Sequence, residues 1–134
     1  MKILVVDDEL VARKKAEKIL SQYGECHTAA NGMRAIEGFE LAHKEGEPYD
    51  FITMDILMPD MSGIEVLEKI REWEGSHDIK LGKGVKILML TATKSKDTVI
   101  PSFSKGCEAY IVKPFNKEKL VNALNKLGFA SNGN

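Results

Sequence analysis

Polar side chains that could take part in chemistry follow the apolar runs of this sequence. The first run, KILVV, is followed by the acids Asp7, Asp8 and Glu9, and the runs FITM, KILML and AYIV are followed by Asp55, Thr91 and Lys113. If the runs are parallel strands, their carboxyl ends lie at one edge of a sheet, which is where ligands bind in open α/β sheets. Carboxylates, a hydroxyl and an ammonium would meet there, and such a set suits a cation and a phosphoryl group.

Each of these groups also has a simpler explanation. The acids after the first run could cap the next helix, because Asp is favoured at N-caps and acids suit the positive end of a helix dipole. Asp55 could begin a turn with Pro59, Thr91 could be one more β-branched strand residue, and Lys113 could be a surface lysine. None of these explanations accounts for carboxylates placed together, because they repel one another unless a cation lies among them.

The expected cation is Mg²⁺ or Mn²⁺, since oxygen ligands without nearby histidine or cysteine favour a hard cation. Thr91 could donate a hydrogen bond to one oxygen of a phosphoryl group, and Lys113 could neutralise another. Asp55 is then the candidate nucleophile, which would carry the phosphoryl group as an aspartyl phosphate.

Five apolar runs predict the strands that would position these groups. The first, third and fourth are apolar throughout, which is typical of parallel strands covered by helices on both faces. Segments with helical spacing lie between the runs, and the one over 97–105 is the least regular because Pro101 falls inside it. The alternation predicts a single three-layer α/β/α sandwich with a five-stranded parallel sheet and five helices. The predicted strands are residues 2–6, 26–30, 51–54, 86–90 and 109–112.

The composition is that of one ordinary globular domain, with 134 residues, 43% of them hydrophobic and 29% charged. The formal net charge is -1 and no long basic block is present, so nucleic acid is not an expected direct partner. The N-terminal apolar stretch is too short for a signal peptide or a membrane span, so we expect a cytoplasmic protein without membrane association. Cys26 and Cys107 have no metal-binding spacing and are expected to be reduced thiols.

Four short motifs, in this order, make the chain resemble the receiver domains of bacterial two-component response regulators of the CheY type. The motifs are VVDDE, MDILMPDMSG, MLTA and GCEAYIVKPF, and they extend over nearly the whole sequence. The resemblance implies a flavodoxin-like sheet with strand order 2-1-3-4-5, a receiver domain over residues 1–128 and a frayed tail over 129–134. It also implies a signalling switch that catalyses only its own phosphorylation and dephosphorylation, and so not an enzyme in the usual sense.

The resemblance also implies ligands for the cation. Asp55 matches the phosphoacceptor of the family. Asp8 and Asp55 match the side chains that bind Mg²⁺ directly, and Asp7 matches an acid that supports the ion through water. The backbone carbonyl of Leu57 matches the third direct ligand.

The switch residues come from the same resemblance. Thr91 and Lys113 match the side chains that contact the phosphoryl group. Tyr110 matches an aromatic residue that turns inward when the threonine moves toward the phosphate. Lys113-Pro114 matches a cis peptide bond, which only X-Pro bonds tolerate readily.

Two positions depart from the better-known chemotaxis pattern. Leu57 stands two residues after Asp55, and Thr93 stands two residues after Thr91. In the family these side chains lie beside the water that hydrolyses the acyl phosphate. We expect the apolar Leu57 to shield the acyl phosphate and to lengthen its lifetime.

The implied partners are a sensor histidine kinase or a phosphotransfer protein as the donor, and an unidentified protein target. That target would bind the face formed by the fourth and fifth helices and the fifth strand. Ala109 and Ala123 stand on this face where dimerising relatives carry charges, so we expect a monomer or a weak dimer. Because the chain begins at Met1 and ends soon after the last predicted helix, we expect a stand-alone regulator.

Two alternatives from other classes remain open. Phosphatases of the haloacid dehalogenase type also use a strand-end aspartate with Mg²⁺, but they need a second acid two residues later, where this chain has Leu57. A pseudo-receiver would bind its partner without phosphorylation, although the complete acidic set disfavours that class.

Overall fold

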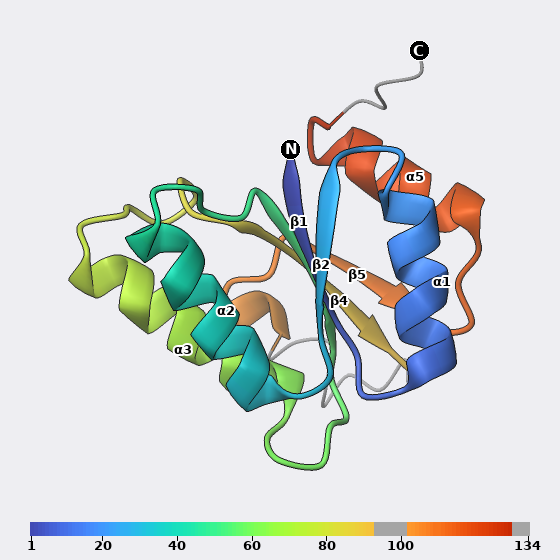
Figure 1. The fold of residues 1–134 in the computed structure, drawn as a ribbon, viewed down its shortest axis with the longest axis horizontal. Helices are drawn as coiled ribbons and strands as arrows, with labels where there is room; N and C mark the ends of the chain where they lie inside the picture. Colours follow the sequence, from blue (N-terminus) through green and yellow to red (C-terminus); the bar gives the residue numbers. More distant parts are fainter. Residues whose placement is uncertain (93–101, 130–134) are drawn as a thin grey trace.

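Five parallel strands form one sheet at the centre of the molecule (Figure 1). The structure, a computed structural model, describes residues 1–92 and 102–129. The order across the sheet is β2-β1-β3-β4-β5, so the predicted order is confirmed. The strands are β1 (Lys2–Val6), β2 (Glu25–Ala29), β3 (Phe51–Asp55), β4 (Lys86–Thr91) and β5 (Ala109–Val112).

The three central strands, β1, β3 and β4, are buried along nearly their whole length. This burial explains why their sequences are apolar throughout, because both faces of the sheet are covered. β2 and β5 lie at the two edges and are more exposed, and β2 begins one residue before its predicted range. Asp55 is the last residue of β3 and pairs with Leu90 of β4, so its carboxylate belongs to the rigid strand.

Helices cover both faces of the sheet, as a three-layer sandwich requires (Figure 1). On one face lie α1 (Leu10–Leu20) and α5 (Lys117–Lys126), and on the other lie α2 (Gly32–Lys44) and α3 (Gly63–Ser76).

Successive side chains of each strand point into two separate cores. Phe51 packs with the group of apolar residues under α1 and α5, together with Leu20 and Leu124. Ile52, the next residue, packs with Phe39 and the group under α2 and α3. This alternation places Asp55 on the same face as Phe51, because the two residues are an even number of positions apart.

Two predictions concern the C-terminal part of the chain. The predicted helix over 97–105 falls largely on residues 93–101, outside the described residues; the described part shows 102–104 as helical. Phe129 was expected in the frayed tail, but its ring lies 5.7 Å from that of Phe51 and its backbone N–H donates to the carbonyl of Leu124 at 3.0 Å. The packed part of the chain therefore extends at least to Phe129.

Candidate functional site

Three carboxylates meet at the carboxyl edge of the sheet. Carboxylate oxygens of Asp7, Asp8 and Asp55 all lie within 4.8 Å of one another. Asp7 follows β1 and Asp55 ends β3, and the two strands are neighbours with Val6 paired to Met54. Asp7 and Asp55 are 1% and 5% exposed, whereas Asp8 is on the surface. Parallel pairing therefore brings acids together that are distant in the sequence.

Lys113, directly after β5, contributes the positive charge of this cluster. Its Nζ lies 2.9 Å from Asp7 Oδ2, 3.3 Å from Asp55 Oδ1 and 3.3 Å from Glu9 Oε1. The contact with Glu9 was not predicted, since nothing in the local pattern links an acid after the first strand to a lysine after the fifth. The single ammonium group of Lys113 thus contacts three carboxylates, which together carry more negative charge than it can neutralise.

The pKa values of Asp55 and Lys113 reflect this crowding. Burial raises the pKa of Asp55, the charge of Asp7 raises it further and Lys113 lowers it, with a result of about 7 against an ordinary 3.8. For Lys113, burial alone would lower the pKa, but the hydrogen bond with Asp7 and the charge of Asp55 outweigh it, so the pKa is raised. The lysine stays charged, and Asp55 carries its charge at neutral pH only in part unless a cation joins the site.

The helix-capping explanation for the first acids is wrong for Glu9. The N-cap of α1 is Glu9, whose side chain makes no capping hydrogen bond. Asp7 Oδ1 accepts a hydrogen bond from the backbone N–H of Glu9 at 2.9 Å, while its other oxygen accepts from Lys113. Asp7 therefore links the N-cap residue of α1 to Lys113 of the acidic cluster.

The donor set fits a hard divalent cation. Within residues 1–92 and 102–129, Asp7, Asp8 and Asp55 are the group of His, Cys, Asp and Glu residues close enough to share one metal ion. All three offer oxygen, and no histidine or cysteine belongs to the group. Oxygen donors of this kind suit Mg²⁺, which typically takes one or two carboxylates and completes its shell with water and phosphate.

Thr91 and Tyr110 lie on the paired strands β4 and β5. Thr91 ends β4 with no exposed surface, and its carbonyl accepts a hydrogen bond of 2.6 Å from the backbone N–H of Lys113. The half-buried Tyr110 lies on the paired strand β5. Burial raises the pKa of Tyr110, and its interaction with the side chain of Thr91 lowers it in part. The two predicted switch residues are thus neighbours in this structure.

The remaining predicted site residues lie around the same edge. The side chain of Leu57, in the loop after β3, is 68% exposed. The peptide bond between Lys113 and Pro114 is cis, as the resemblance implied. Thr93 lies outside the described residues. The role of the Leu57 carbonyl as a metal ligand and the roles of Leu57 and Thr93 in acyl-phosphate lifetime stay predictions.

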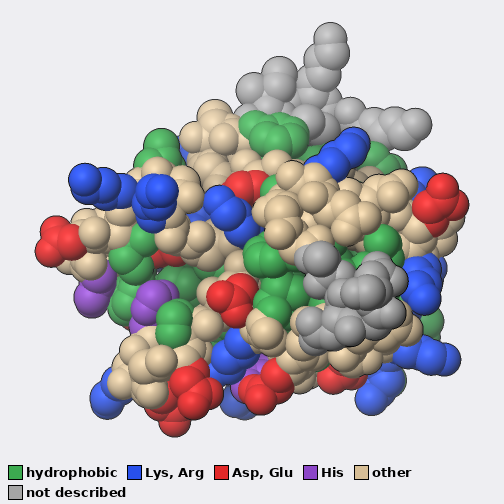
Figure 2. All heavy atoms as spheres, turned by 90° about the horizontal axis from the view of Figure 1, so that it is seen from above, with side chains coloured by type: hydrophobic (Ala, Val, Ile, Leu, Met, Phe, Trp, Pro, Cys, Tyr) green, Lys and Arg blue, Asp and Glu red, His purple; other side chains and the backbone are tan. Residues whose placement is uncertain are grey.

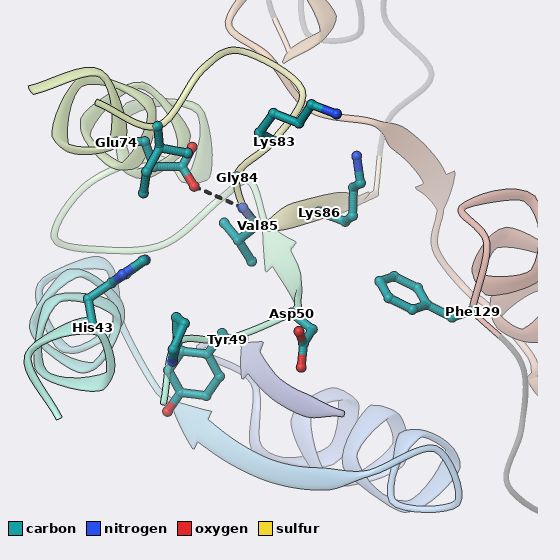
Figure 3. Close-up of a pocket in the computed structure, with 11 residues that line it drawn as sticks. His43, Tyr49, Asp50, Glu74, Lys83, Gly84, Val85, Lys86 and Phe129 are labelled. Carbon is teal, nitrogen blue, oxygen red and sulfur yellow. Dashed lines mark hydrogen bonds between the residues drawn. The ribbon is translucent and has the colours of Figure 1, made fainter. Parts of the chain in front are cut away.

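A hollow of about 340 Å³ lies at the opposite edge of the sheet and contains none of these residues (Figure 3). Tyr49, Val85 and Phe129 line it beside the buried acid Glu74. Both carboxylate oxygens of Glu74 have partners within the fold, because Oε2 accepts a hydrogen bond from the Val85 N–H at 2.8 Å and Oε1 accepts one from Arg71 at 2.7 Å. From this end of the molecule, acidic and basic side chains are both seen on the surface (Figure 2).

The chain is similar to known proteins along nearly its whole length. The family model described as response regulator receiver domain matches residues 3–125. The chemotaxis protein CheY of Thermotoga maritima is 34% identical over 128 residues, which cover 94% of this chain and 96% of that protein. The CheX-CheY-BeF3-Mg²⁺ complex from Borrelia burgdorferi matches with a TM-score of 0.81 and 26% identity, covering 97% of this chain and 90% of that one. CheY4 of Vibrio cholerae matches with a TM-score of 0.77 and 31% identity, covering 93% and 96%.

No helix in residues 1–92 and 102–129 combines the length and the apolar character that crossing a membrane requires.

Proposed function

The chain belongs to the response regulator receiver domain family, a family of phosphorylation switches, and on this premise we propose that Asp55 is the residue that receives the phosphoryl group. The observation that carries the proposal is the convergence of Asp7, Asp8, Asp55 and Lys113 at the ends of three strands. Asp55 is also the last residue of a fully buried strand, which holds the backbone of this residue in a fixed position.

The three acids of the cluster differ in their availability. Both oxygens of Asp7 are engaged, one by the Glu9 N–H and one by Lys113. Asp8 is exposed and lies beyond the end of β1. Asp55 is held less tightly by Lys113, at 3.3 Å, and its raised pKa marks a carboxylate that gains from a partner of opposite charge. These differences favour Asp55 as the nucleophile and the other two acids as metal-binding groups.

Four groups of this chain are proposed to hold the Mg²⁺ ion. Asp8, Asp55 and the backbone carbonyl of Leu57 would bind it directly, and Asp7 would bind it through water. When bound, the ion supplies positive charge to the phosphoryl oxygens and to the crowded carboxylates. Mn²⁺ has the same preference for carboxylate and carbonyl oxygens.

Phosphoryl transfer then involves a short series of steps by the side chains. An oxygen of Asp55 attacks the phosphorus of a phosphohistidine on the donor, the phosphorus–nitrogen bond breaks, and the electron pair of that bond returns to the imidazole. Lys113 neutralises one phosphoryl oxygen as the aspartyl phosphate forms. The donor is proposed to be a sensor histidine kinase or a phosphotransfer protein.

The switch is proposed to operate through Thr91 and Tyr110. In this structure the side chain of Thr91 is close enough to Tyr110 to lower its pKa, so the two side chains interact in the absence of phosphate. When the hydroxyl of Thr91 bonds to a phosphoryl oxygen instead, Tyr110 loses that partner and its position on β5 changes. A protein target that binds the face of β5 and α5 better in one state than in the other would then shift the equilibrium. The target is unidentified.

Two further parts of the proposal concern assembly. Ala109 of β5 and Ala123 of α5 place small uncharged side chains on the output face, which supports a monomer or a weak dimer. The Borrelia CheY was solved with BeF3, a phosphoryl analogue, and with Mg²⁺ and CheX, which supports a phosphoryl site that uses Mg²⁺ and communicates with a partner protein.

Incubation with acetyl phosphate and Mg²⁺ tests the proposal. Intact-mass measurement should show the gain of one phosphoryl group that is stable in acid and labile in base. Asp55→Asn should abolish the gain, and Asp50→Asn, which changes an exposed acid at the other edge of the sheet, should retain it. Turnover of many acetyl phosphate molecules without any phosphorylated protein in the mass spectrum would indicate a phosphatase, and no reaction would indicate a pseudo-receiver. Either result overturns the proposal.

A further inference from the structure

Asp60 connects the loop after β3 to the start of α2. Its Oδ1 accepts a hydrogen bond from the backbone N–H of Gly32 at 3.0 Å, and its Oδ2 accepts one from Met33 at 2.9 Å. Residues 56–62, which we call the β3–α3 loop, and the first turn of α2 lie at the same end of the molecule (Figure 1). No local sequence pattern links Asp60 to these partners, because they are 27 and 28 residues away.

This connection is separate from the cap that α2 makes for itself. The N-cap residue Asn31 accepts a hydrogen bond from the N–H of Arg34 at 2.9 Å. Asp60 accepts hydrogen bonds from the N–H groups of Gly32 and Met33, which the helix leaves without an internal partner. The N–H of Met33 and then that of Gly32 lower the pKa of Asp60, so the carboxylate is charged at the positive end of the helix dipole.

Close packing around two glycines anchors the same loop. A Cβ on Gly32 would lie 2.4 Å from Met61 Cγ, so the Met61 side chain occupies the space left by that glycine at the start of α2. A Cβ on Gly63 would lie 2.1 Å from the carbonyl oxygen of Asp55, and the Gly63 N–H donates to the Ile56 carbonyl at 2.7 Å. The loop is thus fastened at its base to β3 and at its middle to α2.

Leu57 lies between these two anchors. A backbone carbonyl, unlike a side chain, has no rotamers with which to adjust to an ion, so its position depends on the path of the loop. We propose that Asp60 is a positioning residue, which holds the β3–α3 loop against α2 and so sets the affinity of the site for Mg²⁺. The inference rests on the proposed function, because that proposal makes the Leu57 carbonyl a metal ligand.

The test measures the Mg²⁺ dissociation constant of the full chain by calorimetry with MgCl₂ alone. Asp60→Ala should raise it roughly tenfold, the lower end of the effect typical of groups that orient metal ligands. Asp60→Asn keeps one acceptor oxygen and should have a smaller effect. Asn31→Ala is the matched control, since it removes the cap of the same helix end without touching the loop, and it should leave the dissociation constant unchanged.

A second measurement separates positioning from general damage. The rate of phosphorylation by acetyl phosphate should fall in Asp60→Ala at low Mg²⁺ and return to the wild-type rate at saturating Mg²⁺. The inference is overturned if the Mg²⁺ dissociation constant is unchanged in Asp60→Ala, or if it rises equally in Asn31→Ala. In either case, phosphorylation of the wild type on Asp55 leaves the proposed function intact. A wild type that neither binds Mg²⁺ nor takes the phosphoryl group overturns both.

Discussion

Lys113 donates a hydrogen bond of 2.9 Å to Asp7, which is closer than its 3.3 Å contact with Asp55. The lysine is therefore held mainly by the acid after β1 in the absence of a phosphoryl group. A phosphoryl group on Asp55 would carry more negative charge than a carboxylate, so we expect the ammonium to move toward it. In the proposed function, Lys113 would therefore lie beside the reacting oxygen of Asp55 and already be charged when the phosphoryl group arrives.

Lys113→Met is expected to destabilise the metal-free protein by about 3 kcal/mol, because removal of one partner leaves buried carboxylates without their counter-charge. Mg²⁺ should restore part of the loss, since a cation can replace the charge of the lysine. Urea unfolding in EDTA and in Mg²⁺ measures both effects. Lys14→Met, on the exposed side of α1, is the control, and an equal loss in the two variants would contradict the prediction.

Asp55→Asn is expected to stabilise the metal-free protein at pH 8 by about 2 kcal/mol and to have much less effect at pH 4. The pKa of Asp55 is raised in the folded state, from 3.8 to about 7. Protonation therefore favours folding: the stabilisation is complete below about pH 4 and is lost as the pH rises through 7. The uncharged amide avoids that loss.

Urea unfolding of wild type and variant at the two pH values, in EDTA, checks this expectation. Asp78→Asn serves as the control, because Asp78 is exposed after α3 and has a φ of 63°, which asparagine tolerates. A gain in Asp55→Asn that is the same at both pH values would refute the burial argument.

Thr53→Val is expected to stabilise the protein by up to about 1 kcal/mol, since the valine has nearly the same shape and no polar atom. Thr53 is fully buried in β3, and among the described residues its Oγ1 is a buried side-chain oxygen without a hydrogen-bond partner. The midpoint of urea unfolding measures the change. Thr28→Val on the exposed edge strand β2 is the comparison, and a clear loss of stability in Thr53→Val would show that the hydroxyl has a partner in solution.

Leu57→Asn is expected to shorten the lifetime of the aspartyl phosphate by roughly tenfold, a modest effect for a polar group that positions a reacting water. The Leu57 side chain is 68% exposed, so the substitution removes little buried surface and should leave the fold intact. After the donor is removed, intact-mass measurements over time give the rate at which the phosphoryl group is lost. Leu81→Asn, on an 88% exposed leucine of the loop before β4, should not change it.

An unchanged lifetime in Leu57→Asn would mean that the shielding idea is wrong. A loss of phosphorylation itself would instead indicate that the substitution disturbs the Leu57 carbonyl, and Mg²⁺ titration of the variant distinguishes the two results.

The sequence by itself determined the layers of the fold and the edge where the chemistry lies. Uninterrupted apolar runs mark strands buried on both faces, as β1, β3 and β4 are. The carboxyl ends of parallel strands share one edge, so acids and a lysine placed just after those runs had to meet there. The weakest prediction concerned β2, because an exposed edge strand needs few apolar residues and leaves little pattern.

Only the tertiary structure decided which groups touch. Lys113 is shared by Asp7, Glu9 and Asp55, and Asp60 is bonded to the start of α2. Hydrophobic periodicity depends on burial of whole faces, whereas a hydrogen bond depends on the distance between two atoms. For residues far apart in the chain, that distance is set by strand register, helix packing and the path of the loops, and no local pattern encodes it.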